Sequence, residues 1–323
     1  MPTMLSQTLG VRFPIVNAPM TPQAGGALAR AVARSGAFGM LGFDEDESAE
    51  SLRSQIRLIR DSDPHEGPLA FGIGLVRWVI DRRPELIDLV LEACPKLVSI
   101  SFGDPTPFVA RFQEAGILVA SQVQSQRWAE TALSAGVDIL VAQGTEGGGH
   151  TGDVGTLPLL QIVLELAGHT PVVAAGGIAT GRGLAAVLAA GAGGAWIGTP
   201  FLAATEARTN RAAQARITAA TETDTILTDV FDRVQHKAWP GEFKGRALRN
   251  SFTARWENEP VPQSAEPGFA DARTRQDYDI AHIYAGQSVG LIRGTAPAGE
   301  IVKRIVSEAD ACLRRIDTHV FSV

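Results

Sequence analysis

The sequence has little of what metal-binding, disulfide-stabilised and nucleic-acid-binding proteins need. It contains two cysteines, Cys94 and Cys312, and neither lies in a CxxC or other metal-ligand spacing. Both fall in apolar helical contexts, so we expect two buried packing residues and no disulfide between them. The net charge is −6, which leaves no basic field to attract nucleic acid or an anionic membrane surface. No metal site, nucleic-acid partner or membrane partner is therefore expected.

Targeting and membrane signals are also missing. The N-terminus lacks a basic region followed by a long apolar stretch, so no signal peptide is evident and a cytoplasmic protein is expected. Residues 183–204 carry no charge over 22 positions, the length of a membrane span, but five glycines and Pro200 interrupt the run. We expect this run to fold as a helix, a turn and a strand of buried soluble structure.

What the sequence does contain is a regular alternation of short apolar runs and helical segments. Strands that alternate with helices indicate βαβ units and a parallel sheet, and eight such strands favour a closed (β/α)₈ TIM barrel. An open doubly wound sheet stays an alternative, although no GxGxxG motif opens a helix after the first strand. The expected strands span residues 14–20, 38–42, 69–75, 97–101, 117–121, 137–142, 171–175 and 194–198. The expected helices between them span residues 24–34, 48–60, 84–92, 106–114, 125–135, 157–167 and 181–190.

The pattern changes after Pro200. Residues 205–280 are more charged and include Pro/Gly-rich pieces such as Trp239-Pro240-Gly241, whereas residues 285–291 are again apolar and glycine-rich. A last helix is expected over residues 300–314. We interpret residues 1–204 and 285–323 as an α/β TIM barrel and residues 205–284 as a mostly helical insertion or lid near the C-terminus.

One loop combines three glycines with a histidine. Residues 144–152 follow the sixth expected strand and contain Gly147, Gly148, Gly149 and His150. Glycines let backbone approach a ligand closely, and a histidine beside them can exchange protons near neutral pH. Taken alone, the loop is equally compatible with a long turn that carries a surface histidine. Its place after a barrel strand decides for a functional site, because the loops at the carboxyl ends of the strands form barrel active sites.

The loops after the seventh and eighth strands are small and glycine-rich. Gly176-Gly177 precedes a helix, and Gly198-Thr199-Pro200 follows the eighth strand. Barrels often bind phosphate at these two places, with backbone N–H groups as donors. A phosphate cradle, one histidine and no metal ligands suit flavin mononucleotide (FMN), which brings its own redox chemistry. The turn at Ala18 and Met20 would lie behind the isoalloxazine ring, although Met20 equally suits core filling.

The other histidines are weaker candidates for site residues. His65 and His169 lie beside prolines in turns and are expected in solvent. His236 and His282 lie in the expected insertion and are able to face the site, although structural roles are expected for both. No HExxH or GxSxG motif occurs, so neither a zinc protease nor a serine hydrolase is indicated.

Several segments together resemble the nitronate monooxygenase (2-nitropropane dioxygenase) family. They are residues 14–20 (PIVNAPM), 142–150 (AQGTEGGGH), 171–178 (PVVAAGGI), 196–199 (WIGT), 224–228, 245–250 and 285–287. The resemblance covers nearly the whole chain. It implies an FMN-binding barrel that oxidises alkyl nitronates with molecular oxygen, and it allows a homodimer.

The resemblance also assigns roles to residues. Gln143 and Gly148 would contact FMN, and Gly177 together with the segment from Trp196 to Thr199 would hold its phosphate end. His150 would lie near the reactive face of the flavin, where it hydrogen-bonds a nitronate or takes the α-proton of a neutral nitroalkane. We thus expect His150 as the catalytic residue. The expected cofactor-binding residues are Ala18, Met20, Gln122, Gln143, Gly148, Gly149, Gly176, Gly177, Trp196, Ile197, Gly198, Thr199 and Gln287.

Two departures and two rival functions accompany this resemblance. The family usually has Asn in the third-strand segment, where this chain reads Phe71-Gly72-Ile73-Gly74, and a small residue of the histidine loop is Gly147 instead of alanine. The first departure removes an amide near the ring. A flavin-dependent enoyl-acyl-carrier-protein reductase that uses NAD(P)H is the nearest rival, and a flavin-binding module without turnover is another.

Overall fold

An eight-stranded, nearly closed parallel barrel forms the body of the protein. The computed structural model describes residues 3–43, 45–60 and 67–319. Neighbouring strands follow the order β1-β9-β8-β6-β5-β4-β3-β2, and a bridge between Val16 and Phe38 joins the two ends of this row. The TIM-barrel prediction is confirmed, and the open-sheet alternative is wrong. The strands are β1 (Ile15–Asn17), β2 (Gly39–Gly42), β3 (Phe71–Val76), β4 (Leu97–Ser101), β5 (Leu118–Val123), β6 (Ile139–Gln143), β8 (Val172–Ala175) and β9 (Gly194–Ile197).

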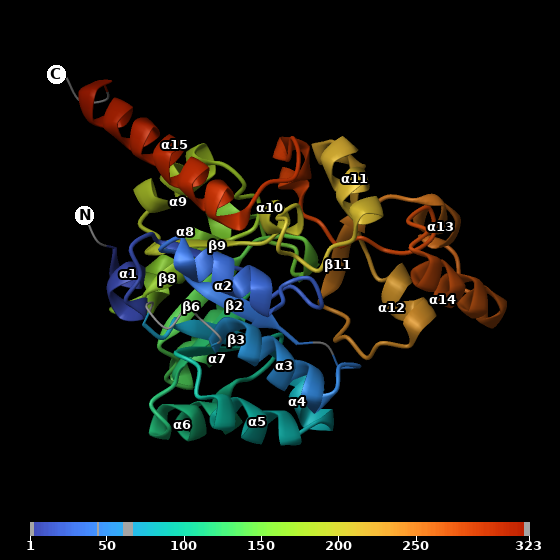
Figure 1. The fold of residues 1–323 in the computed structure, drawn as a ribbon, viewed down its shortest axis with the longest axis horizontal. Helices are drawn as coiled ribbons and strands as arrows, with labels where there is room; N and C mark the ends of the chain where they lie inside the picture. Colours follow the sequence, from blue (N-terminus) through green and yellow to red (C-terminus); the bar gives the residue numbers. More distant parts are fainter. Residues whose placement is uncertain (1–2, 44, 61–66, 320–323) are drawn as a thin grey trace.

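Helices surround the barrel and bury its outer surface (Figure 1). Their apolar faces and the outward-facing strand residues form one large core layer, to which Leu28, Phe112 and Ile305 belong. Each strand is followed by at least one helix, as the alternation in the sequence predicts. The surrounding helices are α2 (Gly26–Arg34), α3 (Ala49–Arg60), α4 (Arg77–Arg82), α5 (Glu85–Ala93), α6 (Thr106–Glu114), α7 (Gln126–Ser134), α8 (Thr156–Ala167), α9 (Gly181–Ala189) and α15 (Ala298–His319).

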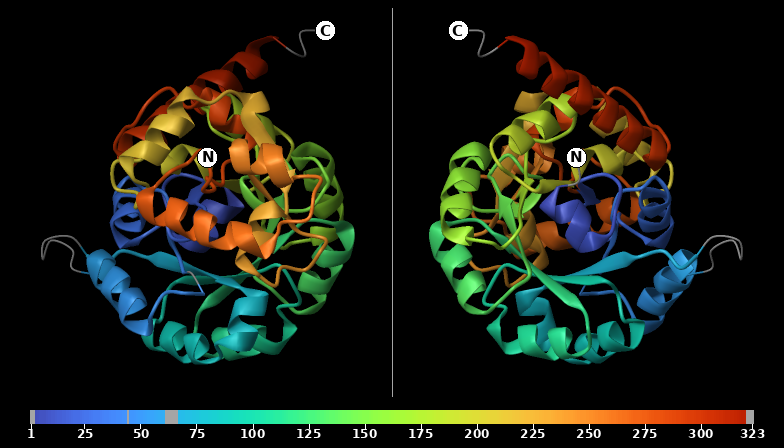
Figure 2. Two further views of the ribbon diagram at one scale, coloured as in Figure 1. Left: turned by 90° about the vertical axis from the view of Figure 1, so that its right-hand side faces the viewer. Right: turned by 90° about the vertical axis from the view of Figure 1, so that its left-hand side faces the viewer.

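The ends of the barrel are closed by different parts of the chain. At one end the short helix α1 (Met4–Leu9), which the sequence analysis did not predict, inserts Leu5 and Leu9 among the inward-facing residues of the strands. Figure 2 shows α1 across this end in its right-hand view and the segment around residues 230–280 across the other end in its left-hand view. Because the strands are parallel, the second end is where their carboxyl-terminal loops meet.

The chain from residue 199 to residue 291 includes the segment across this second end, and we call it the covering region. It contains more than helices. Its strands β10 (Thr225–Thr228) and β11 (Lys244–Leu248) form an antiparallel sheet with β7 (Gly149–Thr151), which belongs to the histidine loop. None of these three strands was predicted from the sequence. The remaining elements are α10 (Thr199–Leu202), α11 (Arg211–Ala219), η1 (Glu222–Asp224), α12 (Val230–Gln235), α13 (Ser251–Trp256), η2 (Gln263–Ala265), α14 (Glu266–Arg275) and η3 (Gln287–Leu291).

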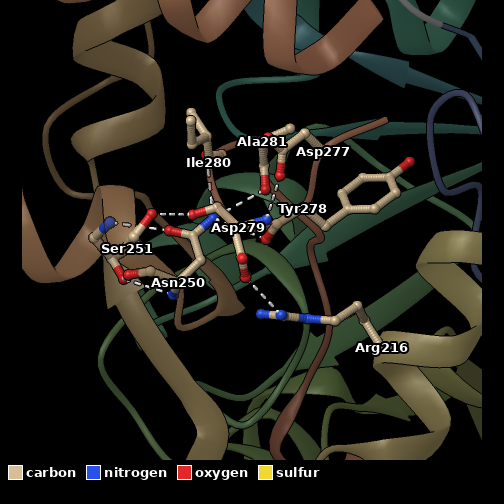
Figure 3. A network of polar contacts seen from close by, with 9 residues as sticks. Arg216, Asn250, Ser251, Asp277, Tyr278, Asp279, Ile280 and Ala281 are labelled. Atoms are coloured by element: carbon tan, nitrogen blue, oxygen red, sulfur yellow. Dashed lines mark hydrogen bonds and ion pairs between the residues drawn. The ribbon is translucent and has the colours of Figure 1, made fainter. Parts of the chain in front are cut away.

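A network of polar contacts fixes the segment 277–281 in this covering region (Figure 3). The Asn250 side chain caps α13 and donates through Nδ2 to the carbonyl oxygens of Ile280 and Ala281, at 3.1 and 2.9 Å. Arg216 Nη1 of α11 pairs with Asp279 Oδ1 at 2.8 Å. These contacts fix the position of segment 277–281, from which the following residues run toward the barrel.

Both cysteines are free, as expected, but the prediction that both are buried is wrong for Cys94. Helix α5 ends at Ala93, so Cys94 takes a left-handed conformation (φ 41°) beyond the helix and is exposed. Cys312 is half-buried on α15. The uncharged run 183–204 divides among α9, β9 and α10. Among the described residues, no helix is long and apolar enough to cross a membrane.

We expect Gly39→Ala to lower the free energy of unfolding by about 3 kcal/mol, because extra atoms in a close-packed core force neighbours apart. A Cβ on Gly39 would lie 2.0 Å from the carbonyl oxygen of Ala29, so α2 would have to move off β2. The matched control is Gly268→Ala in α14, where nothing lies within 4 Å of the added Cβ. Urea unfolding measures both; equal stability of Gly39→Ala and wild type would contradict the close packing of α2 on β2.

Candidate active site

The histidine loop is held as a strand. Its central residue, His150, lies opposite Gly245 in the pairing of β7 with β11. Gln143, at the end of β6, donates through Nε2 to the carbonyl oxygen of His150 at 3.0 Å and accepts through Oε1 from Gln124 at 2.8 Å. Only 7% of His150 is exposed, so the alternative of a surface histidine in a loose turn is wrong.

The imidazole of His150 is oriented by a buried carboxylate. Its Nε2 lies 2.8 Å from Oδ2 of Asp232 on α12, and the two side chains are 7% and 9% exposed. A carboxylate at this distance holds the proton on Nε2 and leaves Nδ1 with a free lone pair. The pair thus has the arrangement of a base and the group that orients it.

Aromatic rings enclose the histidine. Trp239 stacks on His150 with 3.5 Å between ring centroids and 7° between the planes, and Tyr284 lies 5.5 Å away. Trp239 also meets Phe102 edge to face at 4.9 Å. Trp239 therefore connects the covering region to the barrel loops, and the ring of His150 cannot turn without displacing it.

Glycines of three barrel loops meet beside this pair. Gly176 and Gly177 have φ of +101° and +72°, conformations that other residues rarely adopt. A Cβ on Gly176 would come within 2.9 Å of the carbonyl oxygen of Gly144, so the loops after β6 and β8 touch through their backbones. Thr199, after β9, accepts through Oγ1 from the backbone N–H of Gly286 at 2.9 Å. The result is a cradle of backbone at the carboxyl ends of the strands.

These features line one cavity of about 300 Å³, within the size range of small-molecule sites. It contains every site residue expected from the sequence except two. Ile197 faces the helices in the outer core layer, because side chains alternate along β9 and Trp196 faces inward. Gln287 is exposed, and its backbone N–H donates to the carbonyl oxygen of Glu146 at 2.9 Å. The expected residues at the cavity are Ala18, Met20, Gln122, Gln143, Gly148, Gly149, His150, Gly176, Gly177, Trp196, Gly198 and Thr199.

The covering region supplies lining residues that are absent from the expected set of site residues. Asp232, Trp239, His282 and Tyr284 all lie at the cavity. His282, for which a structural role was expected, is half-buried there. Trp239 belongs to a Trp-Pro-Gly piece noted in the sequence, but nothing in the sequence indicates that it meets His150. His282 was named from the sequence as able to face the site, whereas Asp232 and Tyr284 carry no local signal.

The remaining histidines lie away from the cavity where they are described. His169 is exposed, as expected. His236 is exposed too and pairs with Glu266 at 3.0 Å. His65 lies outside the described residues. Within the ranges that the structure describes, no group of three or more His, Cys, Asp or Glu side chains is arranged to hold a metal ion.

Several polar atoms of the cavity wall are buried without a hydrogen-bond partner in the described part of the chain. They are Ser99 Oγ, Trp78 Nε1, Trp196 Nε1 and His282 Nδ1. An unpaired buried polar group costs about 1–3 kcal/mol, so such groups call for a ligand or another partner. The cavity wall thus offers hydrogen bonds to a bound molecule.

This chain is similar to several known proteins in sequence and in fold. Nitronate monooxygenase npaC of Metarhizium robertsii is 31% identical, covering 95% of this chain and 93% of that protein. The structure of FabK from Thermotoga maritima superposes with a TM-score of 0.85 at 28% identity, covering 99% of this chain and all of that one. An octahydro-1H-indene-4-carboxyl-CoA dehydrogenase of Rhodococcus jostii is 33% identical over 73% of this chain.

The fraction of each relative's length that this chain covers differs among them. This chain spans only 61 to 65% of the length of the dehydrogenase and of two further relatives of similar identity. By contrast it spans 90 to 99% of several nitronate monooxygenases that are 27 to 31% identical. A family model described as nitronate monooxygenase matches residues 79–308, which include the histidine loop, the glycine cradle and the covering region. The chain belongs to the nitronate monooxygenase family.

Proposed function

We propose that this protein uses FMN to oxidise alkyl nitronates with molecular oxygen and accepts neutral nitroalkanes after removing their α-proton. The observation that carries the proposal is the buried His150–Asp232 pair at a cavity whose floor is glycine backbone. The near-complete overlap with nitronate monooxygenases supports the same substrate class. A base held by a carboxylate is what a carbon acid needs, because its proton must leave before electrons are transferred.

The residues at the cavity fit FMN. Backbone N–H groups at Gly176-Gly177 and around Gly198 would hold the phosphate, since glycine there leaves the donors uncovered. Buried Trp196 Nε1 and Ser99 Oγ have no partner among the described residues and would donate hydrogen bonds to the bound cofactor. When bound, FMN supplies the electron acceptor for the substrate and passes electrons to oxygen.

The side chains around His150 have separate tasks in this proposal. Nδ1 of His150 takes the α-proton of a neutral nitroalkane or donates a hydrogen bond to a nitronate once protonated. Asp232 keeps the imidazole in one tautomer and stabilises it when it is charged. Trp239, stacked on the same ring, excludes water from that side and prevents rotation. We further propose that residues 205–284 act as a lid, because they contribute Asp232 and Trp239 to the site.

Enoyl-thioester reduction with NAD(P)H is the second candidate, and a structural likeness favours it. FabK, an enoyl reductase of the same family, matches this chain over its whole length. Oxygen uptake with a nitronate, compared with NADH oxidation in the presence of an enoyl thioester, separates the two activities. The nitronate proposal predicts turnover in the first assay and only background in the second.

We expect His150→Asn to lower turnover of a neutral nitroalkane by about 10²–10⁴-fold, the usual contribution of a general base. Turnover of the preformed nitronate should fall much less, because its proton is already gone. Asp232→Asn should lower the same activity by a smaller factor, since it misorients the base without removing it. His169→Asn at an exposed position is the control. Unchanged nitroalkane oxidation by His150→Asn, with FMN still bound, would remove His150 from the base role.

We expect the protein stripped of flavin to rebind FMN at least about 100-fold more tightly than riboflavin, since charge-assisted hydrogen bonds to the phosphate are worth roughly 1.5–3 kcal/mol each. Gly176→Ala should reduce this preference, because its Cβ would push against Gly144 and Thr156 and shift the cradle. Gly136→Ala is matched in its positive φ but has nothing within 4 Å of the added Cβ. Fluorescence titration measures both flavins; equal affinities would contradict the phosphate cradle.

A further inference from the structure

We infer that His282 is a specificity-determining residue: its imidazole hydrogen-bonds a neutral polar group, such as a hydroxyl or carbonyl, on the chain of the substrate. The inference rests on the proposed function for the identity of the reacting group and adds a second point of recognition to it. The preferred substrates would then be nitronates or nitroalkanes whose carbon chain carries such a group away from the reacting carbon.

The ring of His282 lies in an aromatic enclosure. Ring centroids of Phe231 and Phe269 lie 5.5 and 6.0 Å away, with Phe269 nearly parallel to the imidazole. Tyr284 closes a third side at 4.8 Å. Phenylalanine would pack in this enclosure without leaving a polar atom unpaired. The imidazole is therefore not explained by packing alone.

One ring nitrogen of His282 has no hydrogen-bond partner in the described part of the protein. Nδ1 of His282 is shielded from solvent and makes no hydrogen bond, although the side chain lines the cavity. Buried polar groups are nearly always paired, so an unpaired one calls for an explanation such as a functional role or a bound partner. A bound molecule that reaches His282 recovers the hydrogen bond that the protein itself does not supply.

The position of the ring is fixed by the backbone on both sides. Upstream, Asn250 holds the carbonyl oxygens of Ile280 and Ala281 (Figure 3). Downstream, the carbonyl oxygen of Ile283 accepts from the N–H of Leu248 at 2.8 Å, and Tyr284 forms a bridge with Ala247. His282 thus projects from an extended segment tied to β11, the strand that also holds the loop of His150.

The two histidines are close enough for one small molecule to touch both. His150 and His282 line the same cavity, and their rings lie 5.5 and 4.8 Å from the ring of Tyr284. A nitronate with its reacting carbon at His150 would extend along Tyr284 toward His282. Recognition at His282 therefore concerns the chain of the substrate and not the reacting carbon.

The surroundings favour a neutral partner. Burial first, and then electrostatic interactions with Arg273, His150 and Lys237, lower the pKa of His282 to about 3. The imidazole is uncharged near neutral pH, so it donates or accepts a hydrogen bond without carrying charge. The nearby cations already have acceptors: Arg273 bonds Gln235 Oε1 at 2.8 Å, and Lys237 pairs with Glu45 and Asp46.

The test compares three nitro compounds of equal chain length that end in a methyl, a hydroxyl or a carboxylate group. Calorimetry without oxygen measures their binding to the FMN-loaded protein, and steady-state oxygen uptake measures the turnover of their nitronates. Wild type should bind the hydroxyl compound about tenfold more tightly than the methyl compound. His282→Phe should abolish that preference by raising the KM for the hydroxyl compound to that for the methyl compound, while the ratio of their kcat values stays the same. His282→Asn, which keeps a polar group, should retain part of the preference.

The outcomes separate the two proposals. His236→Phe makes the same chemical change at an exposed position and should leave every ratio unchanged. A wild-type preference for the hydroxyl compound that survives in His282→Phe overturns the role of His282, as does a preference for the carboxylate compound or none at all. Binding that follows the expected pattern without oxygen uptake on any nitronate supports the recognition by His282 and removes the proposed oxidation.

Discussion

The pairing of β7 with β11 is the interaction on which the active site depends. It joins a loop of the barrel to a strand found about a hundred residues later, and it places His150 opposite Gly245. The partner has to be glycine, because a Cβ there would lie 2.6 Å from the ring of Tyr284. The absence of one side chain thus lets Tyr284 pass over the strand and reach the cavity. Without this pairing, the glycine-rich loop would lack the backbone partners that keep it extended.

The hydrogen bond between His150 and Asp232 matters because both side chains are buried. A carboxylate out of contact with water is unfavourable unless a hydrogen-bonded partner compensates it, and the imidazole is that partner. Removing either residue leaves the other buried without this hydrogen bond, so the pair also ties helix α12 to the histidine loop. Trp239 adds to this coupling, because the same tryptophan lies on the imidazole and against Phe102 of the barrel. The covering region therefore contributes side chains to the site in addition to covering the end of the barrel.

Prediction from sequence succeeded where the signal was local and failed where it was not. The eight barrel strands were found because each is a short buried run followed by a helix, and the loops of Gly148 and Gly177 were found because glycine marks them. Asp232 was missed since it meets His150 across 82 positions of sequence, a contact that no periodicity records. His282 looked like a structural histidine for the same reason. Ile197 was placed at the site by its neighbours in the motif, although alternation along β9 turns it outward.

The third strand, where the sequence analysis expected a departure from the family, leaves no room for a side chain at Gly74. Gly74 lies opposite Ser99 in the pairing of β3 with β4, and both line the cavity. A side chain at Gly74 has no room here, because its Cβ would lie 2.4 Å from Cγ of Pro19. Ser99, whose Oγ has no partner among the described residues, places a hydroxyl beside that position. A hydroxyl both donates and accepts hydrogen bonds, so Ser99 supplies the polar group at this side of the cavity while Gly74 supplies none.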